Sequence, residues 1–150
     1  MVRMDGGRLA ARGFQYQYLR TLEAMLTASD QERIHGCRIE GPTDTTSTAA
    51  VDVVDFDLVD REGDCLLAAQ VKSASPGRQV SAPDAFTILA ELVCKVEAER
   101  YELITAAVPD RNCRTLAKIL DAPLTDTDQL KSQLAQMLQR APSAATRSKH

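Results

Sequence analysis

The chain has few of the side chains from which zinc sites, thiol redox pairs and histidine-based catalytic centres are built. Its 150 residues include only four cysteines and two histidines. The cysteines are scattered along the chain, and no CxxC or HxxxH spacing occurs. A zinc site or a redox motif is therefore not expected. The two histidines, His35 and His150, are too far apart in the sequence to predict a shared catalytic apparatus.

The chain also lacks a long apolar run and an excess of positive charge. No stretch approaches the roughly 20 apolar residues that span a bilayer. Residues 1–7 (MVRMDGG) carry no apolar core of the kind found in signal peptides. We therefore expect a cytoplasmic protein with reduced thiols and no membrane partner. The formal net charge of -3 counts modestly against a nucleic-acid partner, because no general basic field attracts phosphates.

Length and composition indicate one globular domain. Hydrophobic residues make up 44% of the chain and charged residues 26%, which is ordinary for a protein with a single core. We predict one domain over residues 1–140. The remaining residues, 141–150, are small, polar and basic, which predicts a flexible tail.

Periodicity and turn residues predict the helices. Apolar residues recur at helical spacing over 8–28, and we expect their stripe to lie in the core: Phe14, Tyr18, Leu22, Met25 and Leu26. Ser81 and Asp84 form a capping box ahead of a second helix, predicted over 84–100. Its broad apolar face should pack against a sheet: Phe86, Leu89, Ala90, Val93 and Val96. Two short helices are predicted over 110–120 and 125–139.

Strands are predicted over 37–40, 51–60, 65–72 and 102–108. Because a helix separates the last strand from the one before it, we expect those two strands to be parallel. The second and third strands form a hairpin with a turn at Glu62 and Gly63, so that paired residue numbers sum to 125.

That register places Asp55 directly opposite Gln70 and divides the hairpin into two faces. One face should be polar: Asp55, Asp57, Ala68, Gln70 and Lys72. The other should be a core face: Val54, Phe56, Leu58, Leu67, Ala69 and Val71. Burying polar groups inside apolar strands costs free energy unless they bind a partner or a ligand. The polar face is therefore the candidate functional site.

An acidic strand is followed by a strand that ends in Gln-x-Lys. This pattern resembles the PD-(D/E)xK nuclease superfamily, in the variant of the Mrr-like restriction endonucleases, in which Gln replaces the second acidic residue. Residues 12–19 (RGFQYQYL) also resemble the first helix of nuclease effector domains in bacterial anti-phage proteins. The resemblance implies an α/β, restriction-endonuclease-like fold with an αβββαβ core and a four-stranded mixed sheet flanked by helices. It assigns Asp55 as the metal-binding aspartate, Gln70 as the second motif position and Lys72 as the catalytic lysine.

These residues suit phosphodiester hydrolysis with Mg²⁺ or Mn²⁺, because such ions prefer hard oxygen ligands and keep several waters. Asp55 would supply the main carboxylate, Gln70 an amide oxygen and Val71 a backbone carbonyl. Lys72 would orient water or stabilise charge on the phosphate. Glu40, at a strand end, is a candidate to replace the charge that Gln70 does not carry.

Several alternatives stay open from the sequence alone. Asp57, two residues from Asp55, could be a second ligand or the principal one, and Asp52 is a third candidate. The polar face could instead be the solvated outer side of an edge hairpin, with Lys72 paired to an aspartate.

The resulting expectation is a metal-dependent DNA endonuclease that serves as an effector module of a bacterial anti-phage defence protein. The alternative is a catalytically inactive nuclease-fold domain that acts as an interaction or scaffold module. DNA is the expected partner. A homodimer or higher oligomer, and a fused or associated regulatory NTPase or sensor domain, are compatible with the resemblance.

Overall fold

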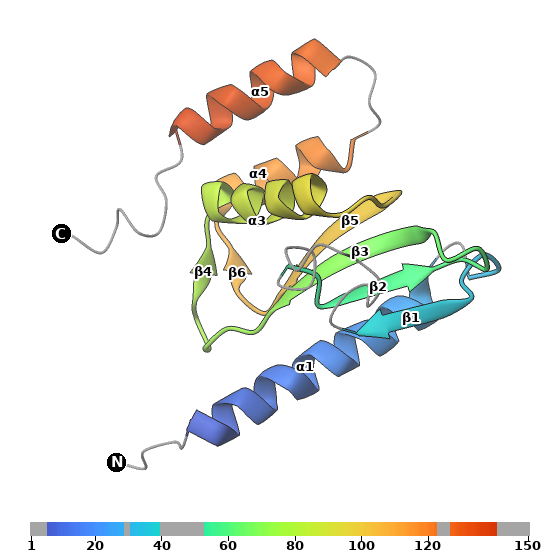
Figure 1. Cartoon of the computed structure of the whole chain (residues 1–150). Helices are drawn as coiled ribbons and strands as arrows, with labels where there is room; N and C mark the ends of the chain where they lie inside the picture. The colour runs from blue at the N-terminus through green and yellow to red at the C-terminus, as the bar shows by residue number, and fades with distance from the viewer. Residues whose placement is uncertain (1–5, 29–30, 40–52, 123–126, 141–150) are drawn as a thin grey trace, which may run out of the picture. The chain divides into compact units, whose positions relative to one another are not determined.

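The computed structural model describes residues 6–28, 31–39, 53–122 and 127–140 (Figure 1). Its helices are α1 (Gly6–Thr27), α3 (Ala82–Lys95), α4 (Arg111–Leu120) and α5 (Thr127–Arg140). Its strands are β1 (Gly36–Ile39), β2 (Phe56–Val59), β3 (Cys65–Lys72), β4 (Gln79–Val80), β5 (Arg100–Thr105) and β6 (Val108–Pro109). None of these helices has the length and apolar character needed to cross a bilayer.

The described chain divides into two compact units. The first comprises Met1–Ala74 and Leu89–Ala106, and the second comprises Ser75–Ile88 and Ala107–His150. The second unit holds a small parallel sheet of β4 and β6, which the sequence did not predict. In that unit Asp110 caps α4, because its carboxylate accepts the backbone N–H of Cys113 at 2.7 Å. The expectation of a single domain over residues 1–140 stays a prediction.

The first unit is an α/β structure built on a four-stranded mixed sheet in the order β1-β2-β3-β5. The β1–β2 and β2–β3 pairs are antiparallel, and β3 pairs with β5 in parallel. The predicted parallel strand is thus confirmed. It ends at Thr105, earlier than predicted.

The hairpin register is confirmed over three residue pairs. Phe56 faces Ala69, Asp57 faces Ala68 and Leu58 faces Leu67. A register shift follows between Leu58 and Val59. Gly63, with a φ of 90°, occupies the left-handed conformation that the turn requires and that glycine adopts without strain.

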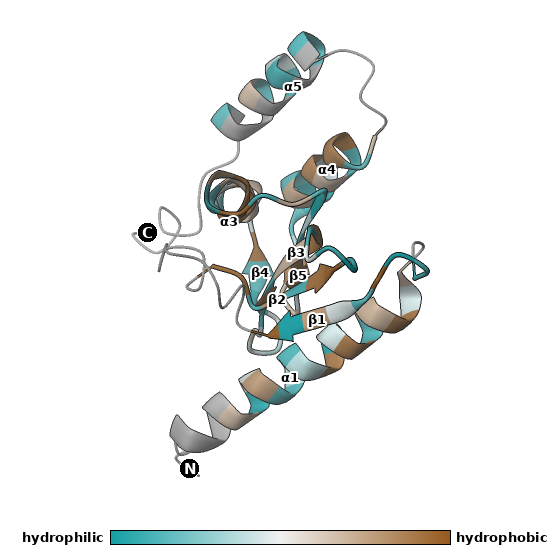
Figure 2. Cartoon of the chain, turned by 45° about the vertical axis from the view of Figure 1, so that its right-hand side comes forward, coloured by the Kyte–Doolittle hydropathy of each residue, from teal (hydrophilic) through white to brown (hydrophobic). Residues whose placement is uncertain are grey.

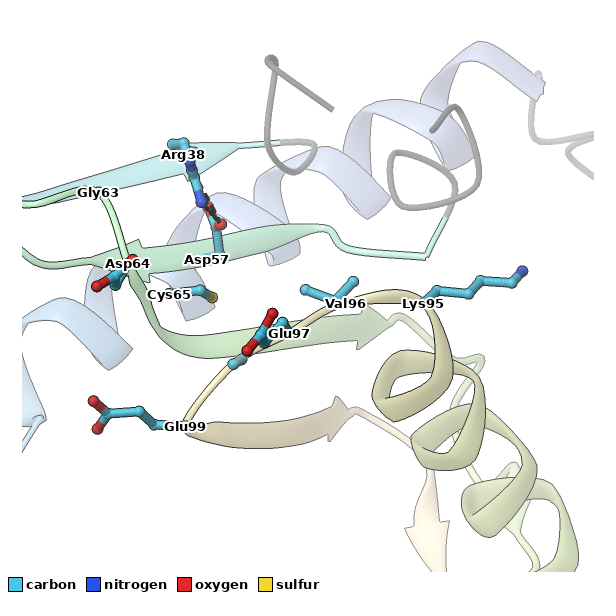
Figure 3. A pocket seen from close by; sticks show the side chains of 10 residues that line it. Arg38, Asp57, Gly63, Asp64, Cys65, Lys95, Val96, Glu97 and Glu99 are labelled. Carbon is cyan, nitrogen blue, oxygen red and sulfur yellow. Dashed lines mark hydrogen bonds and ion pairs between the residues drawn. The ribbon is translucent and has the colours of Figure 1, made fainter. Parts of the chain in front are cut away.

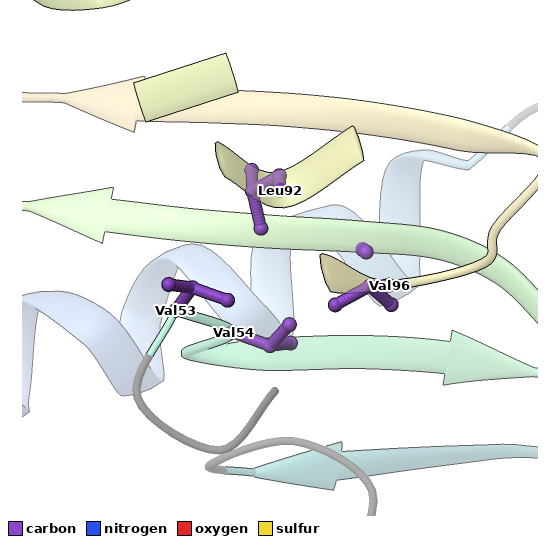
Figure 4. Packing of buried hydrophobic residues seen from close by; sticks show 5 residues of the cluster. Val53, Val54, Leu92 and Val96 are labelled. Atoms are coloured by element: carbon purple, nitrogen blue, oxygen red, sulfur yellow. The ribbon is translucent and has the colours of Figure 1, made fainter. Parts of the chain in front are cut away.

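Each face of the sheet has its own apolar cluster. One comprises Phe56, Leu58, Leu67 and Ala69, and Ala24 and Met25 of α1 pack against it. The other comprises Val53, Val54, Ala68, Leu92 and Val96 (Figure 4). Helices therefore cover both sides of the strands that carry the candidate site.

Two expectations about the hairpin are wrong at its start. Residues 53–55 form a turn and a bend, so β2 begins only at Phe56; residues 51 and 52 lie outside the described chain. Because strand alternation does not extend to the bend, Val54 joins the cluster of Ala68 and Leu92 and not the face of Phe56.

The apolar stripe of α1 does not lie in the core, contrary to expectation. Only Met25 packs against the sheet cluster. The others are half-exposed or more, as is Leu19; we call this set the α1 ridge: Phe14, Tyr18, Leu19, Leu22 and Leu26. Figure 2 shows apolar segments recurring along α1, which lies along the sheet beside β1. The side of α1 with small and polar residues packs inward, including Thr21, which is buried.

The second predicted helix is shorter than expected; Leu89 and Val96 pack against the sheet cluster as predicted, but one residue of its predicted face does not. The α3 helix ends at Lys95, because the hydroxyl of Tyr101 accepts the Ala98 N–H at 3.0 Å and donates to the Val96 carbonyl at 2.8 Å. These bonds satisfy backbone groups that a longer helix would have used. The predicted contact of Val93 is wrong, since Val93 is 54% exposed, and Leu92 is the buried residue of this turn.

Candidate metal and catalytic site

Asp55 stands at the bend before β2, where three hydrogen bonds hold it to neighbouring elements. Its backbone N–H donates to the Ala69 carbonyl at 3.0 Å. Its carboxylate Oδ2 accepts the backbone N–H of Val71 at 2.6 Å. Asp55 is therefore bonded to both neighbours of Gln70 on β3. The register extended from the sequence predicted that Asp55 is a strand residue paired with Gln70. That prediction is wrong.

Gln70 lies in an interior strand and is only 6% exposed. Its Oε1 atom has no hydrogen-bond partner among the described residues. A buried amide oxygen without a partner costs free energy, so a donor or a cation at that position would stabilise the fold. The amide oxygen that the sequence assigned to a metal is thus the atom that lacks a protein partner in the described chain.

Lys72 is the last residue of β3 and is exposed. Its carbonyl accepts the N–H of Ala106 at 3.0 Å, which fixes the backbone where β3 and β5 end. Ser73 follows, and a Cβ added to Gly13 of α1 would lie 3.8 Å from its Oγ. The first helix therefore runs close to the end of the Gln-x-Lys segment.

Gln17 is a site residue that the sequence analysis missed. Its side-chain Nε2 donates to the backbone carbonyl of Asp55 at 3.0 Å. One turn later the hydroxyl of Thr21 donates back to the Gln17 carbonyl at 2.9 Å. The signal in the sequence is the run of small and polar residues at intervals of four, at Gly13, Gln17 and Thr21, which marks the side of the helix that packs closely.

Asp57 has a different partner from the one considered for it. It is fully buried, and both of its oxygens accept the guanidinium of Arg38, with an Nη2–Oδ2 distance of 2.5 Å and Nε–oxygen distances of 3.0 Å. Arg38 faces Asp57 across the β1–β2 pair. Because this carboxylate is already neutralised by a bidentate ion pair, Asp55 is the better metal ligand of the two.

The interpretation as a solvated edge hairpin does not hold. Both β2 and β3 are interior strands of the sheet, and Asp57 and Gln70 are buried. Lys72 alone of the predicted polar face is exposed.

An open pocket of about 550 Å³ lies at the opposite end of β3 from Lys72 (Figure 3). Arg38 and Asp57 point toward one another at its wall, with Cys65 of β3 beside them. Burial, followed by the charge of Asp57, raises the pKa of the Cys65 thiol to about 12. That thiol is a poor nucleophile near neutral pH, so the pocket offers no thiol chemistry.

The remaining predicted ligands are not placed by the structure. Glu40 and Asp52 lie outside the described residues, and the ligand role of the Val71 carbonyl stays a prediction. Within the described ranges, no group of three or more His, Cys, Asp or Glu side chains is close enough together to hold a metal. Among the described residues, a metal at this site would thus have Asp55, neutral oxygens and water as ligands.

No family model, curated protein or solved structure matches this chain. Its function has to be argued from its own residues.

The arrangement combines a carboxylate, a buried amide oxygen and a terminal lysine on one short segment of the sheet. A carboxylate and an amide oxygen are suitable ligands for a hard divalent cation that keeps several waters. An exposed ammonium two residues from Gln70 can approach a phosphate or a water molecule at that cation. This set of groups suits hydrolysis of a phosphate ester better than acyl or thiol chemistry.

Proposed function

We propose that this chain is a metal-dependent DNA endonuclease domain, with Asp55, Gln70 and Lys72 as its site. The observation that carries the proposal is the unsatisfied Oε1 of buried Gln70, on a strand whose next residue holds the carboxylate of Asp55. A divalent cation would satisfy that oxygen and the carboxylate together.

Each residue has a distinct role in the proposal. Asp55 and Gln70 hold Mg²⁺ or Mn²⁺, with Glu40 as a further candidate ligand. The bound ion makes its water more acidic and offsets charge on the phosphate. Lys72 stabilises the negative charge that develops on the phosphate in the transition state. Gln17 is a positioning residue, because its bond to the Asp55 carbonyl fixes the backbone that carries the carboxylate.

The order of elements supports a restriction-endonuclease-like arrangement. A helix, three strands, a helix and a parallel strand follow one another along the chain, with the short β4 inserted before α3. The acidic residue precedes the second strand, and Gln-x-Lys ends the third. The role as an effector module of a bacterial anti-phage protein rests on the resemblance of residues 12–19.

A second candidate function is a nuclease-like domain without activity that serves as an interaction or scaffold module. It is favoured by the ion pair of Asp57 with Arg38, which occupies a carboxylate that the sequence offered as a ligand, and by the lack of a cluster of three or more ligand side chains among the described residues.

Incubation of plasmid DNA with Mg²⁺ or Mn²⁺ tests the proposal on the wild type and on Lys72→Ala. We expect the wild type to nick or linearise the plasmid. The variant should be at least about a hundredfold slower, since one charged transition-state contact contributes about 3 kcal/mol. Because Lys72 is exposed, its replacement should leave the fold intact.

Lys118→Ala is the matched control, since Lys118 is also exposed but lies on α4. It should cleave as the wild type does. Equal rates in the wild type and Lys72→Ala would assign any cleavage to a contaminant or to another site. Absence of cleavage by the wild type, with either metal, would favour the scaffold.

A further inference from the structure

The α1 ridge is an apolar surface that the fold of its own unit leaves exposed. Phe14, Tyr18 and Leu22 are 50%, 50% and 52% exposed, and Leu19 and Leu26 are 66% and 67% exposed. Taking roughly 200 Å² for a large apolar side chain, the ridge presents on the order of 500 Å². That is the size of the largest apolar patch on a typical monomer, and such patches mark contact surfaces.

We propose that the α1 ridge binds the same ridge of a second copy of this chain, with the two helices antiparallel. Two such ridges would together bury on the order of 1,000 Å² from these side chains alone, which is the size at which specific interfaces begin. Four of the five side chains follow one another at intervals of four, and Leu19 lies three residues before Leu22. Helix–helix packing uses this spacing.

Charge favours a second copy of the chain as the occupant. Arg12 and Glu23 are both exposed and eleven residues apart, close to three full turns, so they lie on the same flank of α1. In an antiparallel pair related by a twofold axis, like flanks meet, and with the ridges centred on each other Arg12 of each copy and Glu23 of the other are about 8 Å apart along the helix axes, within reach of their long side chains. Glu23 also pairs with Arg20 through Oε2, and a carboxylate can accept further donors.

The ridge is separate from the proposed catalytic site. None of its five residues belongs to that site: Gln17 contacts the bend at Asp55, whereas the ridge residues are half-exposed or more. An oligomerisation measurement needs neither DNA nor metal, so its result is independent of whether the chain cleaves DNA.

Sedimentation equilibrium over the micromolar range tests the pairing on the purified chain. We expect a monomer–dimer equilibrium for the wild type. Leu19→Glu should weaken dimerisation at least about a hundredfold, because it places a charge in each copy of an apolar contact. Val93→Glu is the control, since Val93 is an exposed apolar residue of α3, and its dissociation constant should equal that of the wild type.

A charge exchange tests the antiparallel register. Arg12→Glu and Glu23→Arg should each weaken the dimer about tenfold, and the double variant should recover most of the loss. Within one helix the two side chains are about 16 Å apart, so recovery can arise only between copies. Circular dichroism would verify that each variant is folded. A monomeric wild type, a dimer insensitive to Leu19→Glu or a double variant without recovery would each overturn the proposal.

Discussion

The carboxylate of Asp55 accepts the backbone N–H of Val71 at 2.6 Å, which joins the bend before β2 to the middle residue of the Gln-x-Lys segment. In a regular strand pair the Val71 N–H would donate to a backbone carbonyl. Here it donates to the Asp55 side chain and orients it. The bond fixes one carboxylate oxygen beside Gln70. This relation gives the proposed site a rigid geometry, because both partners are held in backbone that the sheet already orders.

Metal binding should stabilise the protein through Asp55. We expect Mg²⁺ or Mn²⁺ to raise the melting temperature of the wild type, because an ion that binds only the native state shifts unfolding by mass action. Asp55→Asn keeps an oxygen that can accept the Val71 N–H but removes the charge, so the metal-induced shift should largely disappear. Differential scanning fluorimetry with and without the ion measures it, and equal shifts in both proteins would place the metal elsewhere.

Gln70→Met should separate stability from metal binding. Removing a buried oxygen that has no partner in the described chain should leave the metal-free melting temperature equal or higher, while the response to Mg²⁺ is lost. Gln70→Glu should behave in the opposite way, because a buried carboxylate destabilises the metal-free protein and binds the ion more strongly. A metal response of Gln70→Met equal to that of the wild type would remove Gln70 from the site.

Gln17→Ala should weaken metal binding although Gln17 is not itself a proposed metal ligand. The variant loses the donor to the Asp55 carbonyl, and residues that orient a ligand typically affect metal affinity or activity by 10- to 100-fold. The concentration of Mg²⁺ at half-maximal thermal shift should rise, whereas the saturating shift is kept. Gln15→Ala, on an exposed position of the same helix, is the control. An unchanged midpoint would mean that Gln17 only helps α1 to pack.

Parts of the fold could be predicted from the sequence because local signals determine them. The turn residues around Gly63 identify the hairpin, although its predicted register holds only beyond the shift between Leu58 and Val59, and the intervening helix makes β5 parallel to β3. The placement of α1 could not be predicted, because its most apolar side is exposed while Thr21 is buried. Periodicity identifies an apolar side of a helix but not the surface that covers it.

The sequence names the residues of the proposed site, and the structure agrees with their predicted geometry only in part. Asp55 was identified from its position in an apolar run, yet its bond to Val71 depends on a bend that strand alternation cannot foresee. The sequence could not exclude Asp57 as a metal ligand, because its ion-pair partner, Arg38, is nineteen residues away in the sequence. Long-range ion pairs leave no local pattern.

The thiols should differ in reactivity according to their surroundings. With its pKa raised to about 12, Cys65 has about one thiolate in ten thousand molecules at pH 8. Burial also raises the pKa values of Cys37 and Cys113, whereas Cys94 is exposed. Iodoacetamide at pH 8 should therefore label Cys94 first, as peptide mapping by mass spectrometry would measure. Labelling of Cys65 at the rate of Cys94 would show that the sheet opens at the start of β3.

Breaking the buried ion pair should cause a large loss of stability in the first unit. Arg38→Ala leaves the fully buried carboxylate of Asp57 without its partner, and removal of one member of a buried pair costs about 3–5 kcal/mol. The free energy of unfolding from urea denaturation, with its slope unchanged, measures this loss. The control is Arg33→Ala, whose pair with Glu99 is half-exposed at the surface, so its loss should be much smaller.

Replacing both partners tests the cause of that loss. Arg38→Met with Asp57→Leu should recover most of the stability, because apolar side chains of similar size can replace a buried pair without leaving a charge unpaired. If the double variant were as unstable as Arg38→Ala, an unpaired carboxylate would not explain the loss, because the double variant has no carboxylate at position 57. The energetic role of the pair would then be small, whereas the bonds of Arg38 to both Asp57 oxygens would still occupy that carboxylate and leave Asp55 as the candidate ligand.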